Sequence, residues 1–268
     1  MRYIIAFLIS LSFCMAKADA VGDARKFADA RNYNAAISLL NEEISRGGAS
    51  SGLYYDLGVV YNKSGNLGAS ALNFAKALRL DPSNKEAKNN SLVVAADVQR
   101  LNESLTGDKN LDPTPQISSA GEKISGALAA CGSNFWCVLA IVTFIIGISA
   151  IGVYFLTAGV TVRKIGFFGG IAVILLSCVL FIFALVARNS QLATDRAVIM
   201  SAQVQLKSTP GENGKDVAAP LAGGTLVKVV STRQMDDKTQ WAEVFLNTDY
   251  NGWIPASDLE IINIPGMK

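Results

Sequence analysis

Few side chains in this sequence are spaced for chemistry. The chain contains no histidine, which is the commonest general acid or base and the commonest metal ligand in proteins. Two pairs of adjacent carboxylates, Glu42-Glu43 and Asp236-Asp237, fall in expected helix or strand, where neighbouring side chains point apart. The segment Gly211-x-x-Gly214-Lys215 lacks the spacing of a phosphate-binding loop. No nucleophile is matched with a base, so we expect no catalytic residue, no cofactor, no metal site and no enzyme.

The cysteines leave two interpretations open. Cys14 lies in the segment 1–20 and Cys178 lies inside a long apolar run, whereas Cys131 and Cys137 flank the start of another such run. An oxidising compartment would allow a disulfide between the latter two. Six positions apart on near-helical chain, however, they would not face each other, so small apolar packing residues are the favoured interpretation.

Two uncharged apolar runs decide the architecture. They cover residues 135–160 and 165–187 and are separated by Arg163-Lys164. A bilayer core is about 30 Å thick and is crossed by roughly 20 apolar helical residues, so each run is long enough. Backbone groups in lipid must be hydrogen-bonded internally, so both runs are expected to be helices. We predict a transmembrane hairpin with a tight turn at 161–164, which places the segments before and after it on the same side of the membrane.

The segment 1–20 indicates which side that is. Arg2, an apolar stretch and Ala18-Asp19-Ala20 are typical of a signal peptide cleaved after Ala20. A lipoprotein signal at Cys14 is the weaker alternative, because Phe13 stands where a small residue is needed. Export places the turn with Arg163-Lys164 in the cytoplasm, in agreement with the positive-inside rule, although Arg188 flanks the exported side. We therefore expect a bacterial inner-membrane protein with its N- and C-terminal modules in the periplasm.

Residues 21–105 are expected to be a short helical repeat. Similar residues recur 34 positions apart at 24 and 58, 27 and 61, 36 and 70, and 40 and 74. The pattern resembles the tetratricopeptide repeat and implies two repeats, followed by a capping helix near 84–103 whose capping box is Ser83–Glu86. Because stable arrays usually need three or more repeats, we expect this domain to lean on a partner or on the membrane.

The resemblance also implies a concave partner-binding face. The positions that match its ligand-facing residues are Tyr55, Val59, Asn62, Lys63 and Asn89. The alternative is an ordinary solvated helix face, which is rich in such residues. Tyr55 and Val59 stand where the family's clamp for a peptide carboxylate would need Lys and Asn, so that clamp is absent.

Residues 106–134 are expected to connect the repeats to the hairpin. Gly107, Pro113 and Pro115 are typical of a linker. Residues 117–130 return to helical character and are expected to lie on the membrane surface. Within the hairpin, Gly166-x-x-x-Gly170 is expected to pack the two helices together, with dimerisation as the alternative.

Residues 195–264 change to β character. Six short runs separated by turns cover 197–200, 204–207, 225–230, 241–245, 252–255 and 259–262. With Gly224-Thr225-Leu226-Val227 and Gly252-Trp253-Ile254, the segment resembles a bacterial SH3-like domain, a small β-barrel. We expect Trp241 and Trp253 to be chiefly core rather than ligand contacts. Tyr250 is the expected exposed aromatic, and peptidoglycan is the alternative ligand.

The fold class is therefore a multidomain membrane protein: an all-α tetratricopeptide repeat domain, a transmembrane helical hairpin and a small SH3-like β-barrel. This order resembles the BatE family of the bacterial aerotolerance (Bat) operon. The resemblance implies a non-catalytic inner-membrane scaffold or adaptor, linked to oxidative stress tolerance, whose partners are other membrane proteins with von Willebrand factor A domains. A membrane-anchored cell-wall tether is the alternative. The formal net charge is only +2 and no block is strongly basic, so lipid is an expected partner and nucleic acid is not.

Overall fold

The structure is a computed structural model that describes residues 21–116, 119–236 and 238–265. The expected signal peptide, residues 1–20, lies outside the described residues. The chain divides into two compact units. One contains the segment up to Gln116 together with the segment from Thr194 onward, and the other contains the residues between them.

The helices of the first unit begin at polar caps. Residues 21–29 are helical, and four helices follow: α2 (Tyr33–Gly47), α3 (Ser51–Lys63), α4 (Leu67–Leu80) and α5 (Lys85–Thr106). The side chains of Asn32, Ser50, Asn66 and Asn84 each accept a hydrogen bond from the backbone N–H three positions on. Such a bond satisfies one of the donors that a helix start leaves free. Asn84 therefore caps α5, in place of the capping box expected from Ser83.

Most of the positions that recur with the repeat period are core positions. Ala24, Ala36, Leu40, Ser70 and Phe74 are all buried. A Cβ on Gly58 would lie 2.7 Å from the Phe74 ring, and the Ser70 hydroxyl donates to the Gly58 carbonyl at 2.8 Å. Small residues thus allow α3 and α4 to approach closely. The exceptions are Phe27, which is 41% exposed, and Tyr61, which is half-buried.

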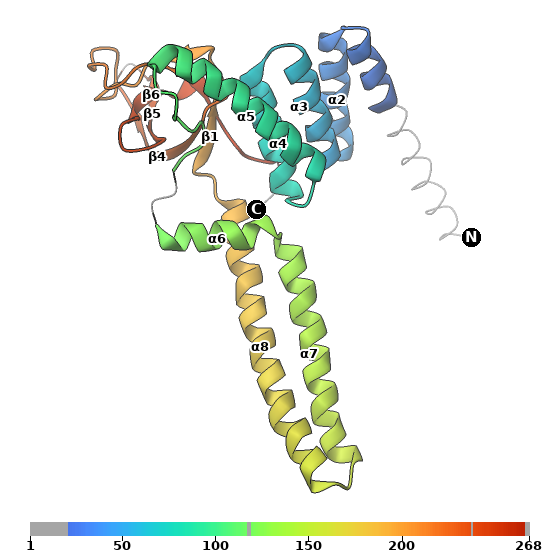
Figure 1. The fold of residues 1–268 in the computed structure, drawn as a ribbon. Coiled ribbons are helices and arrows are strands. Elements are labelled where there is room, and N and C mark those ends of the chain that lie inside the picture. The colour runs from blue at the N-terminus through green and yellow to red at the C-terminus, as the bar shows by residue number, and fades with distance from the viewer. Residues whose placement is uncertain (1–20, 117–118, 237, 266–268) are drawn as a thin grey trace. The chain divides into compact units, whose positions relative to one another are not determined.

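The C-terminal segment forms two antiparallel sheets (Figure 1). The larger has the order β6-β5-β4-β1-β7, and the smaller pairs β2 with β3. Their bounds are Arg196–Ile199 (β1), Gln203–Val204 (β2), Leu221–Ala222 (β3), Leu226–Gln234 (β4), Gln240–Phe245 (β5), Asn251–Pro255 (β6) and Leu259–Ile261 (β7), with a 3₁₀ turn at Ala256–Asp258. Among the described residues β6 and β7 do not pair, so the sheet is open and the expected closed barrel is not formed.

The edge at β7 is covered by helices instead. Glu260 on β7 forms an ion pair with Lys76 on α4, with Nζ and Oε1 2.8 Å apart. Val198, Ile262 and Ile264 belong to the same buried cluster as the apolar side chains of the helices. An edge strand that packs on a helix gains burial without pairing with another strand, which accounts for the open sheet.

A buried polar contact joins α5 to the sheet. The Asn102 side chain is fully buried, donates to the Thr225 hydroxyl at 3.0 Å and accepts from the Ala222 backbone N–H at 2.8 Å. Gly224 has φ +93°, and a Cβ there would lie 2.6 Å from Val98 Cγ2. Figure 1 shows α5 running from the other helices to the sheet. The helices and the sheet are therefore one body, although the hairpin separates them in sequence.

The expected linker also packs within this body. Leu111 is 1% exposed and belongs to the core of the sheet. The Pro113 carbonyl accepts from Leu226 N–H at 2.8 Å, and Gln116 N–H donates to the Leu246 carbonyl at 2.8 Å. Residues 111–116 thus add to the sheet and are not a free tether.

The second unit is a helical hairpin preceded by a short helix. It comprises α6 (Ala120–Ala130), α7 (Ser133–Leu156) and α8 (Val160–Leu192), and α7 and α8 lie side by side (Figure 1). By length and composition both long helices can cross a membrane, and most of each apolar segment is exposed. The turn was expected at 161–164 but lies at 157–159, because Arg163 N–H already donates to the Gly159 carbonyl. Arg163 and Lys164 are therefore the fourth and fifth residues of α8.

Small residues bring the two long helices together. A Cβ on Gly170 would lie 2.6 Å from Ile151 Cγ1, and one on Gly166 would lie 2.8 Å from the Ala150 carbonyl oxygen. The Ser177 hydroxyl donates across the pair to the Ala140 carbonyl at 2.9 Å. The predicted glycine pair thus packs within the hairpin. Cys131, Cys137 and Cys178 are free thiols.

Candidate functional site: a charged groove between the helices

A cavity of about 290 Å³ opens between the first helix, α3 and the start of α5. Its floor is apolar and its rim carries charges of both signs. The lining residues are Ala24, Arg25, Ala28, Asp29, Leu40, Tyr55, Asp56, Val59, Val60, Lys63 and Glu86. The volume lies at the lower limit of the roughly 300–1,000 Å³ of small-molecule pockets. It has room for side chains of a bound segment and not for a folded domain.

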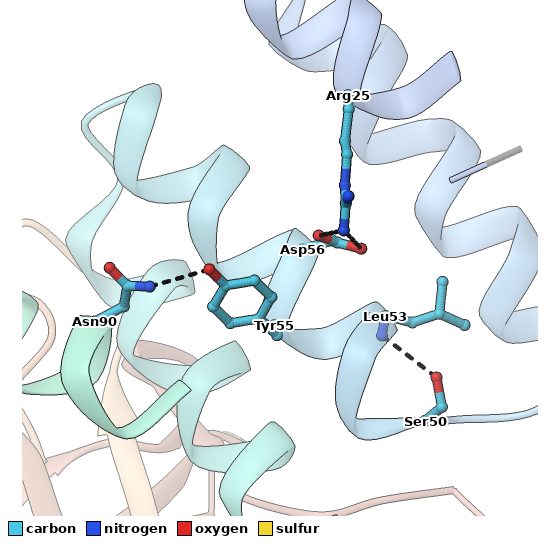
Figure 2. A network of polar contacts seen from close by, with 6 residues as sticks. All are labelled: Arg25, Ser50, Leu53, Tyr55, Asp56 and Asn90. Carbon is cyan, nitrogen blue, oxygen red and sulfur yellow. Dashed lines mark hydrogen bonds and ion pairs between the residues drawn. The ribbon is translucent and has the colours of Figure 1, made fainter. Parts of the chain in front are cut away.

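Two ion pairs cross the groove from the first helix to α3. An Arg25 guanidinium nitrogen lies 3.1 Å from Asp56 Oδ1, and Lys63 Nζ lies 3.0 Å from Asp29 Oδ1. Figure 2 shows Arg25 reaching from its helix toward the Asp56 carboxylate. The side chains of Arg25 and Asp29 are largely exposed, at 67% and 74%. The Lys63–Asp29 pair is exposed on both sides, and such pairs contribute roughly 0–1 kcal/mol, so an incoming charge can displace it at small cost.

The Asp56 carboxylate is the most buried charge in the groove, with its side chain 12% exposed. Burial raises the pKa of Asp56 above its ordinary value of 3.8; Arg25 opposes that rise and the negative charge of Glu86 adds to it. Desolvation disfavours the charged form, as does a like charge nearby. The groove therefore holds a carboxylate that a second positive charge would stabilise.

Tyr55 is held in one orientation at the wall of the groove. Its hydroxyl accepts a hydrogen bond from the Asn90 side chain at 3.2 Å, as Figure 2 shows. Its ring centroid lies 6.0 Å from that of Phe74, in a tilted arrangement. The phenol is thus fixed on one side by α5 and on the other by the core of the repeat.

Three of the five sequence-predicted partner-binding residues line the groove: Tyr55, Val59 and Lys63. Asn62 and Asn89 are not among the lining residues. Asn89 is exposed on α5, and its neighbour Asn90 makes the contact to Tyr55.

Sequence reasoning missed the four other charged residues of the rim, which are Arg25, Asp29, Asp56 and Glu86. One signal was present: Asp29 and Lys63 are separated by the repeat period and carry opposite charges. Equivalent positions of adjacent repeats face each other, so opposite charges at that spacing indicate an ion pair across the groove.

Of the aromatic residues in the sheet, Trp241 is buried as expected, whereas Tyr250 departs from the prediction. Tyr250 was expected to be exposed but is 9% exposed and belongs to the core of the sheet. Side chains alternate along β5, and Ala242 and Val244 point into that core. Trp241, which is 6% exposed, therefore lies on the opposite face. Trp253 lies on the same outer face, because it pairs with Glu243.

Trp253 also has a cationic neighbour on that outer face. It is half-buried, and the Arg233 guanidinium carbon lies 5.7 Å from its ring centroid. This distance is within the range of a cation–π contact.

No protein-family model, curated protein or solved structure matches this chain. The residues themselves are therefore the basis for assigning a function. Within the described ranges, no three His, Cys, Asp or Glu side chains are grouped to hold a metal ion. The lining offers a ligand an apolar floor and charges of both signs.

Proposed function

We propose that this protein is a membrane-anchored scaffold or adaptor that holds a segment of a partner protein in the groove between its helices. The observation that carries the proposal is the groove itself, with its apolar floor, charged rim and fixed Tyr55. The exposed Lys63–Asp29 ion pair at the rim is readily exchanged for contacts to a partner. The repeat departs from the known carboxylate-clamping pattern, so its ligand differs from an acidic C-terminal peptide.

The shared core of helices and sheet supports a membrane anchor of hairpin type. Two antiparallel helices return the chain to the side from which it came, so the segments before and after them can meet only on one side. Asn102 on α5 and Thr225 in the sheet do meet, although the hairpin separates them in sequence. The hairpin is thus an insertion into one binding module, which it would hold at a membrane surface.

The side of the membrane and the kind of partner are inferred from the sequence. A signal-like N-terminus and the basic pair at Arg163-Lys164 favour a module in the periplasm of a bacterial inner membrane. The resemblance to the BatE family of the aerotolerance operon favours partners that are membrane proteins with von Willebrand factor A domains. On this proposal the protein contributes to an envelope complex linked to oxidative stress tolerance.

Site-specific photo-crosslinking in the native host tests the proposal. A photoreactive residue at Lys63, inside the groove, is expected to give a discrete adduct with a membrane protein. The same residue at Ser45, which is exposed on α2 and outside the groove, is the matched control and is expected to give none. Adducts of equal yield from both positions, or none from Lys63, would count against a scaffold that works through this groove.

The outer face of the sheet favours a second candidate, a cell-wall tether. Trp253 and Phe245 are half-buried on that face and Arg233 lies beside Trp253, and an aromatic ring with an adjacent cation suits a polar, ring-bearing polymer. Sedimentation of the full chain with purified sacculi separates the candidates. Loss of sedimentation on Trp253→Ala would support the tether, whereas no sedimentation of the unaltered chain would exclude it.

A further inference from the structure

We propose that the groove recognises a basic side chain, lysine or arginine, of the bound partner segment, at a position between Glu86 and Asp56. This rests on the proposed function, because it names the chemistry of the segment that the same groove would hold. Three observations lead to it: the charge balance of the rim, the burial of Asp56 and the placement of Tyr55.

The charges of the rim do not cancel. Asp29, Asp56 and Glu86 are negative, and Arg25 and Lys63 are positive. Arg25 pairs with Asp56 and Lys63 pairs with Asp29. Among the described residues Glu86 forms no ion pair or hydrogen bond, so one negative charge faces the cavity without a partner.

Glu86 lies at the N-terminal end of α5, on the rim of the groove. It lies in the first turn of α5, where the helix dipole stabilises a negative charge. Its charge is close enough to Asp56 to add to the rise in the pKa of that buried carboxyl. Glu86 is exposed and Asp56 is largely buried, and two like charges that repel each other are both stabilised by a cation placed between them.

The groove already holds one guanidinium. Arg25 reaches Asp56 with a single nitrogen, at 3.1 Å from Oδ1 and 3.5 Å from Oδ2, from a side chain that is 67% exposed. The pocket thus accommodates this chemistry, and its present occupant is loosely held. A partner cation would bind Glu86 and compete with Arg25 for Asp56.

Tyr55 completes the recognition site. Tyr55 lines the same cavity as the two carboxylates, and Asn90 fixes its hydroxyl. A cation over a tyrosine ring gains roughly 0.5–1 kcal/mol when exposed and more when desolvated. Together the carboxylates and the ring favour a long basic side chain over a neutral or acidic one.

Selection from a library of short random peptides on the full chain in lipid nanodiscs tests the inference. The expected result is enrichment of lysine or arginine at one position, together with binding that weakens as salt rises. For a selected peptide, Glu86→Gln is expected to weaken binding about tenfold or more, since hydrogen bonds to charged groups are strong. Asp97→Asn removes an acid from the same helix outside the groove and is expected to change binding little.

Arg25→Gln is expected to change the affinity for the peptide in the opposite direction to Glu86→Gln. It removes the internal competitor for Asp56 and is expected to tighten binding of the same peptide, whereas a merely structural role for Arg25 predicts weaker binding. Enrichment of acidic residues, absence of any charge preference, or binding unaffected by Glu86→Gln would overturn the inference. Groove-specific crosslinking at Lys63 would still stand in that case, so failure of the cation site and failure of the scaffold are distinguishable.

Discussion

Two glycine-to-alanine substitutions with opposite expected signs test whether the helices and the sheet share one core. Gly68 lies on α4 where the sheet packs against it: a Cβ there would lie 3.0 Å from the Ile199 carbonyl oxygen and 3.3 Å from Met200 Cα. Gly52 lies on α3 with no atom within 4 Å of its Cβ position. Both are helical, so alanine removes the same backbone entropy from the unfolded chain at each.

The magnitudes follow from these surroundings. Alanine in place of a helical glycine stabilises the folded state by about 0.5–1 kcal/mol. No other effect is expected for Gly52→Ala, and this value is an upper limit because Gly52 lies close to the start of its helix. At Gly68 the new methyl presses on backbone atoms that cannot rotate away, and such overpacking costs about 1–3 kcal/mol. We therefore expect Gly68→Ala to be less stable than Gly52→Ala by about 1–3 kcal/mol.

Urea unfolding in detergent, followed by tryptophan fluorescence, measures both. Trp241 and Trp253 lie in the sheet, so their emission reports on the sheet although the substitutions are on helices. Trp136 lies on α7 and is replaced by phenylalanine in every variant. A stabilising Gly68→Ala, equal to Gly52→Ala, would refute the contact between α4 and the sheet.

Three further predictions concern single contacts. Asn102→Ala leaves the buried Ala222 N–H without an acceptor and is expected to lower the free energy of unfolding by about 1–3 kcal/mol in the same assay; an unchanged midpoint would argue against the contact. Burial raises the pKa of Asp56 above 3.8, so the folded state binds that proton more tightly than the unfolded state does. Stability is therefore expected to fall as pH rises from 3.8 through the folded pKa, and Asp56→Asn should flatten that part of a urea-midpoint curve. Gly170→Ala, whose Cβ would lie 2.6 Å from Ile151, is expected to separate α7 from α8 in spin-label distance measurements, whereas Gly169→Ala, with no atom within 4 Å, should not.

Periodicity predicted the elements well because burial on one face imposes it. The helices of residues 21–105 and six of the seven strands were recognisable from the periods of helices and of strands, and the two long helices from the length of their uncharged apolar runs. The missed strand, Leu221–Ala222, is very short and pairs only with β2, so no alternation can show it. The sequence prediction placed the turn of the hairpin at Arg163-Lys164 because these residues are charged. Charged residues can also lie within a helix, and here both belong to the start of α8.

The joining of the helices to the sheet was beyond sequence reasoning. Nothing in the sequence around Asn102 indicates that its side chain forms hydrogen bonds with Ala222 and Thr225, which lie far along the chain. The helical domain was expected to lean on a partner or on the membrane, whereas in this structure the C-terminal segment of the same chain supplies buried side chains to the helical core. The groove was found in part, because three of its residues occupy repeat positions, whereas Arg25 and Glu86 come from the segments on either side.

The most direct test of the account is the position of both segments relative to the membrane. Single cysteines at Ser45 on α2, at Glu212 in the loop before β3 and at Gly159 in the hairpin turn, each in a chain without its native cysteines, report this by labelling intact cells with an impermeant thiol reagent. The account predicts that Ser45→Cys and Glu212→Cys are labelled in intact cells, and that Gly159→Cys is labelled only after permeabilisation. Labelling of only one of the first two would contradict a hairpin inserted into a single module.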